Sequence, residues 1–162
     1  MQQNTRGAKN DLRNIARRAM LERGLQPDFS AQAQREAQAI TRAATISDPA
    51  VRDLRDVLWA SIDNDDSRDL DQLSASAGAA NGSTRILIAI ADVDALIVEN
   101  SAIDAHARIN TTSVYTVAQI FPMLPEKFST DLTSLNQDRD RLALVVDMTI
   151  DANGGIAQSA IY

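Results

Sequence analysis

The protein has 162 residues, of which 44% are hydrophobic and 23% charged, with a formal net charge of −6. This length predicts one domain, which can bury a core without disulfide or metal cross-links. The composition argues against a disordered chain. The absence of cysteine excludes disulfides, thiolate metal sites and cysteine nucleophiles. No apolar run reaches the roughly 18 residues that span a bilayer and no signal peptide opens the sequence, so we expect a cytoplasmic protein with no membrane partner.

Charge is divided unevenly along the chain. Residues 1–42 hold eight basic and four acidic residues, whereas residues 43–162 hold eight basic and eighteen acidic ones. The negative total argues against a nucleic-acid partner. Residues 1–42 carry a net positive charge, so this argument does not apply to them.

Two helices are predicted in the first part of the chain. Residues 8–23 place apolar side chains roughly on one face, and a glycine and a proline follow as stop signals. Ser30 can cap a second helix over residues 31–44, which carries a weak alanine-rich stripe. An Asp-Pro break then follows, so we expect a helical segment over residues 1–47 and a separate region over residues 48–162.

The rest of the chain alternates predicted strands and loops. Apolar runs predict strands over residues 57–62, 84–93, 142–150 and a last strand that ends at Tyr162. Hairpin turns are predicted over residues 78–82 and 153–155. Ser101 with Asp104 resembles a capping box that opens a short helix to about Arg108. These elements predict an α+β fold with a mixed, mostly antiparallel sheet.

An aspartate cluster is the most unusual segment. Residues 63–71 hold five carboxylates directly after the predicted strand 57–62. Two charges about 4 Å apart repel by roughly 4 kcal/mol at a protein surface, so folding them together needs a cation, an arginine or raised pKa values. The segment is a solvated acidic loop, a calcium loop or a catalytic magnesium site. The calcium loop fails because, counted from Asp63, Arg68 replaces the required glycine and Ser74 the required glutamate.

A series of short blocks follows in order after residue 50. The blocks are 53–56 (DLRD), 61–63 (SID), 69–71 (DLD), 90–93 (IADV), 101–108 (SAIDAHAR), 112–115 (TSVY), 122–126 (PMLPE), 132–136 (LTSLN) and 141–144 (RLAL). Each block alone is a weak signal, but the ordered series closely resembles the catalytic domain of the ribonuclease II (RNB) family of exoribonucleases. The resemblance covers about residues 50–162 and implies the N-terminal half of an RNB catalytic domain.

The resemblance assigns roles within the aspartate cluster. The family's first motif has four aspartates with the spacing D-x5-D-x-D-D, and Asp63, Asp69 and Asp71 match its first three positions. They are implied to hold Mg²⁺, with Mn²⁺ as the alternative, and to position the attacking water, with Asp71 the most sensitive. Gln72 stands at the fourth position. Its amide oxygen can bind a metal but carries no charge, so one metal site should be weaker.

RNA-contacting residues are implied by the same resemblance. Tyr115 falls in the segment that lines the family's RNA channel, where stacking on a base is worth about 1–3 kcal/mol. The alternative for Tyr115 is a tyrosine packed in the core. Arg108 and Ser113 are implied to contact phosphates. His106 is expected on the surface without a catalytic role, and Trp59 in the core.

The implied activity is metal-dependent, processive 3′→5′ hydrolysis of single-stranded RNA to 5′-mononucleotides. The expected partners are single-stranded RNA and the remaining part of the same polypeptide, which would supply the second half of the RNB domain and an S1-like domain. The helices before residue 48 are either a small helix-turn-helix-like element that grips RNA or a scaffold. The alternative function, suggested by Gln72, is a catalytically weakened RNB-like regulator that binds RNA.

Overall fold

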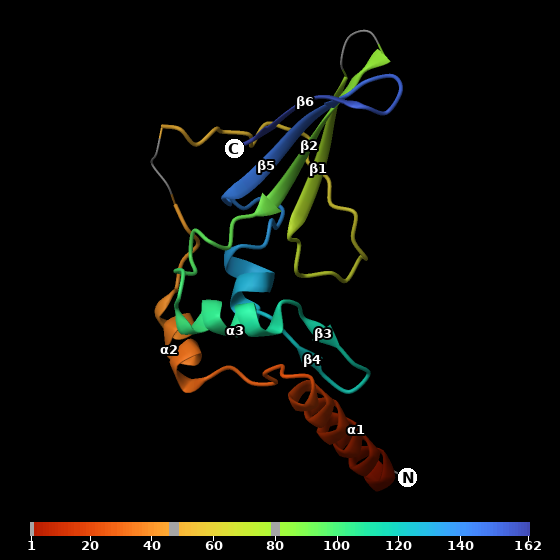
Figure 1. The fold of residues 1–162 in the computed structure, drawn as a ribbon, viewed down its shortest axis with the longest axis vertical. Helices are drawn as coiled ribbons and strands as arrows, with labels where there is room; N and C mark the ends of the chain where they lie inside the picture. Colours follow the sequence, from red (N-terminus) through yellow and green to blue (C-terminus); the bar gives the residue numbers. More distant parts are fainter. Residues whose placement is uncertain (1, 46–48, 79–81) are drawn as a thin grey trace. The chain divides into compact units, whose positions relative to one another are not determined.

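A computed structural model gives the fold of the chain (Figure 1). It describes residues 2–45, 49–78 and 82–162, and the side chains from residue 10 onward within these ranges. No helix in these ranges is long and apolar enough to cross a lipid bilayer.

The chain folds into two compact units, which we describe separately. The helical unit comprises Met1–Thr41 and Ile97–Glu126, and the sheet unit comprises Arg42–Leu96 and Lys127–Tyr162. Each unit is therefore built from two segments of the sequence. The boundary expected after residue 47 was placed at the Asp-Pro break in the sequence, and it stays a prediction.

The helical unit contains three helices and a small hairpin. They are α1 (Gln2–Glu22), α2 (Ala31–Ala39), α3 (Ala102–Asn110), and the antiparallel pair β3 (Val114–Tyr115) and β4 (Ile120–Phe121). Ser30 caps α2 as predicted, because its side chain accepts a hydrogen bond from the backbone N–H of Ala33 at 3.1 Å. The helix ends at Ala39, five residues earlier than expected, and the backbone of its C-cap Ile40 is extended.

Helix α3 begins at the predicted cap. The Ser101 hydroxyl oxygen accepts a hydrogen bond from the N–H of Asp104 at 3.2 Å, and the Asp104 carboxylate accepts one from the N–H of Asn100 at 2.8 Å. The helix ends at Thr111, which adopts a φ of 58° and donates its N–H to the Ala107 carbonyl at 2.7 Å. Both ends are thus fixed by local polar groups.

Two side chains of α3 hold the loop between α1 and α2. The Asn110 amide accepts a hydrogen bond from the N–H of Gln26 and donates one to the Gln26 carbonyl, both at 2.8 Å. Nδ1 of His106 lies 3.2 Å from the Gln26 side-chain oxygen, and the His106 ring lies 4.1 Å from that of Phe29. His106 is only 3% exposed, so the expectation of a surface histidine is wrong. Its partners come from a loop 80 residues earlier in the chain.

The buried position of His106 predicts a pH dependence. Burial lowers the pKa of this histidine, although the Pro122 backbone and the Asp28 carboxylate partly oppose the shift. The unfolded chain therefore takes up the proton at higher pH, near 6.5. Stability from the neutral ring is present above that pH and is lost as the pH falls toward the folded pKa. NMR titration of this single histidine should give a midpoint below about 6.5, and a midpoint above it would contradict the burial argument.

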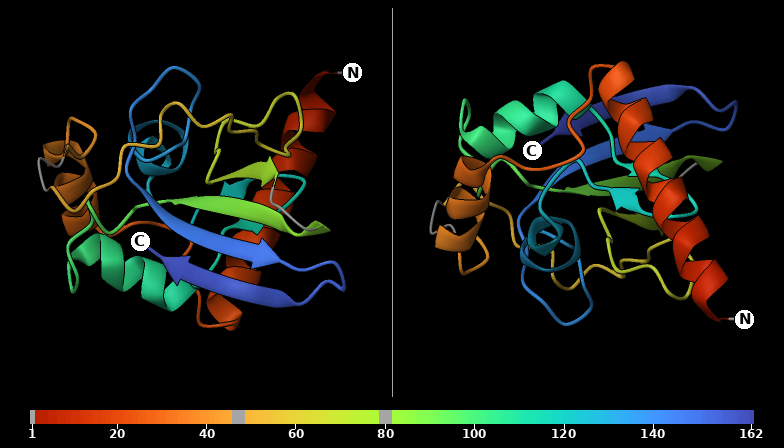
Figure 2. Two further views of the ribbon diagram at one scale, coloured as in Figure 1. Left: turned by 90° about the horizontal axis from the view of Figure 1, so that it is seen from above. Right: turned by 90° about the horizontal axis from the view of Figure 1, so that it is seen from below.

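The sheet unit is built on four antiparallel strands in the order β1-β2-β5-β6. The strands are β1 (Gln72–Gly78), β2 (Thr84–Ala91), β5 (Ala143–Ile150) and β6 (Ile156–Ile161), and they run side by side in Figure 2. A short π-helix, η2 (Phe128–Leu132), precedes β5. The predicted strands at β2, β5 and β6 are confirmed, as is the mixed α+β class. The predicted turn over residues 78–82 lies mostly at residues 79–81, outside the described residues.

One face of this sheet carries the core of the unit. Its buried members are Ala75, Leu87, Ala89 and Val145 from the strands, together with Leu135. Trp59 packs against this cluster and donates its indole N–H to the Leu54 carbonyl at 3.0 Å, so its expected place in the core is confirmed.

The strand expected over residues 57–62 is absent. Only Ala60 pairs with β1, through two hydrogen bonds with Ser74 of 2.9 and 2.8 Å. Leu58 and Ile62 are 93% and 91% exposed. Residues 57–62 therefore form an irregular segment at the edge of the sheet. The packing of Trp59 holds this segment in place, and it has no continuous series of strand hydrogen bonds.

Candidate functional site

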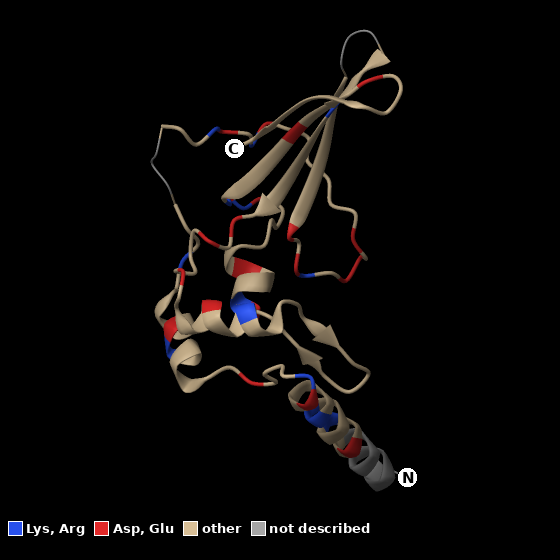
Figure 3. Cartoon of the chain, viewed as in Figure 1, with Lys and Arg blue, Asp and Glu red and all other residues tan. Residues whose placement is uncertain are grey.

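The aspartate cluster lies along the loop that leads into β1, where Figure 3 shows its acidic residues in red. The side chains are exposed at all five acidic positions: Asp63, Asp65, Asp66, Asp69 and Asp71. Asp71 directly precedes β1, and its backbone carbonyl accepts a hydrogen bond from the N–H of Ala91 at 2.9 Å. The β1–β2 ladder thus extends by one residue and fixes the backbone of Asp71 beside the end of β2.

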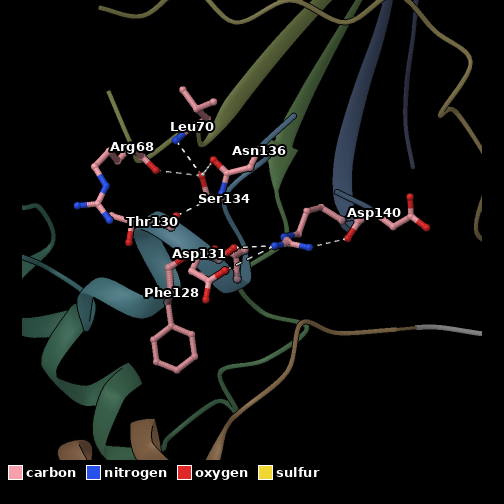
Figure 4. A network of polar contacts seen from close by, with 10 residues as sticks. Arg68, Leu70, Phe128, Thr130, Asp131, Ser134, Asn136 and Asp140 are labelled. Carbon is pink, nitrogen blue, oxygen red and sulfur yellow. Dashed lines mark hydrogen bonds and ion pairs between the residues drawn. The ribbon is translucent and has the colours of Figure 1, made fainter. Parts of the chain in front are cut away.

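Hydrogen bonds hold the backbone of Leu70, which lies between Asp69 and Asp71 in the sequence (Figure 4). The N–H of Leu70 donates to the hydroxyl oxygen of Ser134 at 3.1 Å, and the Leu70 carbonyl accepts from the N–H of Leu135 at 2.7 Å. The sequence blocks 69–71 and 132–136 therefore meet in space. Sequence reasoning recognised both blocks but gave Ser134 no role. Its only signal was a small polar residue between Leu132 and Leu135.

The cluster suits a hard cation in chemistry but not in arrangement. Carboxylate oxygens are the ligands that Mg²⁺ and Mn²⁺ prefer. Among the described residues, however, no group of three His, Cys, Asp or Glu side chains could hold a metal ion. Asp63, Asp69 and Asp71 supply suitable donors without converging on one point.

Gln72 is the first residue of β1 and pairs with Ile90 of β2. Consecutive side chains on a strand point to opposite faces of the sheet. The amide of Gln72 and the core side chain of Leu73 therefore lie on opposite faces. Because the ladder extends to Asp71, the side chains of Asp71 and Gln72 also lie on opposite faces.

The residues expected to contact RNA belong to the helical unit. Tyr115 is 67% exposed on β3, so its alternative as a core tyrosine is wrong. Arg108 is exposed and pairs with Asp104 at 2.9 Å. The hydroxyl oxygen of Ser113 accepts a hydrogen bond from the N–H of Met123 at 2.9 Å. The Tyr115 side chain is therefore largely exposed, and Arg108 and Ser113 have partners within the unit.

Several carboxylates outside the cluster form ion pairs with arginines. Arg55 binds Asp53 through contacts of 2.9 and 2.6 Å and also reaches Asp140 at 3.1 Å. These hydrogen bonds lower the pKa of Asp53 to about 2. Arg85 binds Asp147 through contacts of 2.9 and 2.5 Å and likewise lowers its pKa. The Arg55–Asp140 and Arg85–Asp147 pairs join segments that are far apart in the sequence.

The chain is similar to known proteins in sequence and in fold. The RNB domain family matches residues 51–162. The chain is 35% identical over 136 residues to ribonuclease R of Thermotoga maritima, covering 83% of this chain and 19% of that protein. It is 39% identical over 110 residues to ribonuclease R of Escherichia coli, covering 68% and 14%. The structure of Mycoplasma genitalium RNase R in complex with double-stranded RNA matches with a TM-score of 0.80 and 28% identity, covering 94% of this chain and 27% of that one.

The chain therefore belongs to the RNB family of exoribonucleases. Within that family, the similar proteins reported above are all ribonucleases R. The chain spans about a fifth or less of the length of the two curated relatives, 19% and 14%. The family resemblance and the α+β fold expected from the sequence are both confirmed.

Proposed function

We propose that this chain is the aspartate-bearing part of an exoribonuclease that hydrolyses single-stranded RNA processively from the 3′ end to 5′-mononucleotides. The observation that carries the proposal is the RNB match over residues 51–162, with three aspartates of the family's motif at its expected spacing. The exposure of the Asp63, Asp69 and Asp71 side chains also supports it, because a substrate can reach exposed residues.

The proposed cofactor is Mg²⁺, or Mn²⁺, bound by Asp63, Asp69 and Asp71. Such a cation polarises water and neutralises charge on the scissile phosphate. Because the described residues do not converge on a metal site, the remaining ligands would come from RNA phosphate oxygens or from protein outside this chain. The carboxylates of this chain would contribute the negative charge that retains the cation beside the phosphate.

The remaining partners follow from the same proposal. The second half of an RNB domain, with its arginine-rich motif, and an S1-like domain would complete the enzyme in the full-length polypeptide. The basic residues of the first 42 positions would help to hold RNA, and a chain without cysteine is compatible with the cytoplasm. We expect the 162 residues alone to be inactive.

The test uses the full-length polypeptide that contains this chain and an unstructured RNA labelled at its 5′ end. Hydrolysis in Mg²⁺ should shorten the labelled RNA from its 3′ end, and chromatography should identify 5′-mononucleotides. Removal of the cation with EDTA should stop the reaction. Internal cuts, or no hydrolysis with any single-stranded RNA, would overturn the proposal.

A second candidate function is an RNA-binding regulator with weak catalysis, which is favoured by Gln72 at the fourth aspartate position. The substitution Gln72→Asp distinguishes the two. The enzyme proposal expects substantial hydrolysis before the substitution and a modest change after it. A large gain from a negligible starting activity would support the regulator instead.

Tyr115 gives a prediction about RNA affinity. Tyr115→Ala should weaken binding of single-stranded RNA by about 1–3 kcal/mol, because the exposed ring would no longer stack on a base. Tyr115→Phe should retain most of the affinity. Fluorescence anisotropy with a labelled RNA measures both variants. Val117→Ala, at a 93% exposed position of the same hairpin, is the matched control, and an equal loss in that variant would contradict stacking.

A further inference from the structure

The polar network beneath the aspartate loop points to a residue with a function of its own. We propose that Ser134 is a positioning residue, which fixes the backbone between Asp69 and Asp71 and thereby sets the rate of RNA hydrolysis. This inference rests on the proposed function, because it assigns those two aspartates to the reaction. Ser134 is 1% exposed, so it acts through the loop rather than by touching RNA.

The Ser134 hydroxyl is the central group of the network (Figure 4). Its oxygen accepts a hydrogen bond from the N–H of Leu70 at 3.1 Å. Its single proton has two acceptors within reach, the Arg68 carbonyl and the Asn136 side-chain oxygen, both at 3.3 Å. One hydroxyl therefore contacts the backbone on both sides of Asp69.

Neighbouring groups complete the support. The N–H of Leu135 donates to the Leu70 carbonyl at 2.7 Å, so both polar groups of Leu70 have partners. The Asn136 amide nitrogen donates to the Thr130 carbonyl at 3.2 Å, which ties the network to η2. Leu70 stands between the two aspartates in sequence. Holding its N–H and its C=O restricts the directions in which both carboxylates leave the backbone.

Removing the Ser134 hydroxyl would break one of the two hydrogen bonds that hold the Leu70 backbone and leave the other intact. In Ser134→Ala, the Leu70 carbonyl keeps its bond to Leu135, but the Leu70 N–H and the Arg68 carbonyl lose their partner. The peptide that joins Asp69 to Leu70 can then rotate. Small displacements of catalytic groups have large effects on rate, and a misplacement of about 1 Å can cost roughly 100-fold.

The adjacent residue provides a matched control. Thr133 is also buried, at 5% exposure, and its hydroxyl donates to the Phe128 carbonyl at 2.8 Å, within the η2 region. The hydroxyl and the backbone N–H of Thr133 both donate to the Phe128 carbonyl, which lies outside the aspartate loop. Thr133→Val therefore deletes a buried hydroxyl and preserves side-chain shape, which reproduces any general loss of stability.

Two measurements on the full-length polypeptide test the inference. Hydrogen exchange followed by mass spectrometry reports on the Leu70 N–H, through peptides that cover residues 68–72. Exchange there should accelerate about tenfold or more in Ser134→Ala, and should stay near the wild-type rate in Thr133→Val. In hydrolysis assays, kcat should fall roughly 10- to 100-fold in Ser134→Ala with KM nearly unchanged. Ser134→Cys, which keeps a weaker donor and acceptor, should recover part of the loss.

The outcomes separate this inference from the proposed function. Wild-type hydrolysis with an unchanged kcat in Ser134→Ala overturns the positioning role and leaves the enzyme proposal intact. Equal acceleration of exchange in both variants shows a general loss of stability and also overturns it. A wild-type protein without hydrolysis overturns the proposed function, and with it the catalytic role of Ser134, whereas hydrogen exchange still decides whether Ser134 holds the loop.

Discussion

Asp71→Asn in the full-length polypeptide should lower hydrolysis of single-stranded RNA by roughly 100-fold or more, as expected when a preorganised charge is removed from an active site. Asparagine keeps the size of the side chain and loses the charge. The hydrogen bond between Asp71 and Ala91 uses the backbone carbonyl, so the substitution preserves the start of β1. Turnover of labelled RNA measures the loss, and anisotropy should show nearly unchanged RNA binding.

Asp65→Asn is the matched control for this prediction. Asp65 is an exposed acid of the same loop, and the substitution removes the same charge, but the residue matches no position of the family's aspartate motif. Its turnover should stay close to that of the wild type. Wild-type turnover in Asp71→Asn, or equal losses in both variants, would contradict the role given to Asp71.

Asn110→Ala should have the largest effect on stability, lowering the free energy of unfolding by about 2–4 kcal/mol. Asn110 is 1% exposed, and its amide satisfies both the N–H and the carbonyl of Gln26. Alanine leaves these two backbone groups without their partner and releases the loop between α1 and α2. Urea unfolding of the chain, followed by circular dichroism, measures the change.

Gln38→Ala is the control, because Gln38 is an exposed residue of α2. Such surface changes usually stay within about 0.5 kcal/mol. Asn110→Asp keeps the size of the side chain but turns the donor that faces the Gln26 carbonyl into an acceptor, so it should also destabilise the chain. A neutral effect of either Asn110 variant would show that the loop does not depend on this amide.

Local signals in the sequence predicted the elements whose causes are local. The apolar, β-branched runs at β2 and β5 and the caps at Ser30 and Ser101 all appear where expected. Strand β1 was not predicted, because its serines, alanines and glycine have weak strand preference and its pairing depends on β2. The opposite error occurred over residues 57–62, where an apolar run has only one paired residue.

The candidate site likewise has features that the sequence predicts and features that depend on distant contacts. The ordered series of sequence blocks, with the aspartate motif among them, was sufficient to indicate the family, and the family match over residues 51–162 confirms it. The burial of His106 and the contact of Ser134 with Leu70 depend on partners 80 and 64 residues away, which no local pattern contains. Both assignments therefore required the three-dimensional structure.

The sequence separation within the aspartate support has a consequence for synthesis of the protein. Leu70 finds its acceptor 64 residues later in the chain, and the Arg68 carbonyl finds its donor 66 residues later. At roughly 5–20 residues per second, a ribosome needs about 3–13 s to make that interval. During this time the nascent chain carries the acidic loop without its support. The loop can reach its final geometry only after residue 136 has left the exit tunnel, so its assembly is a late event in cotranslational folding.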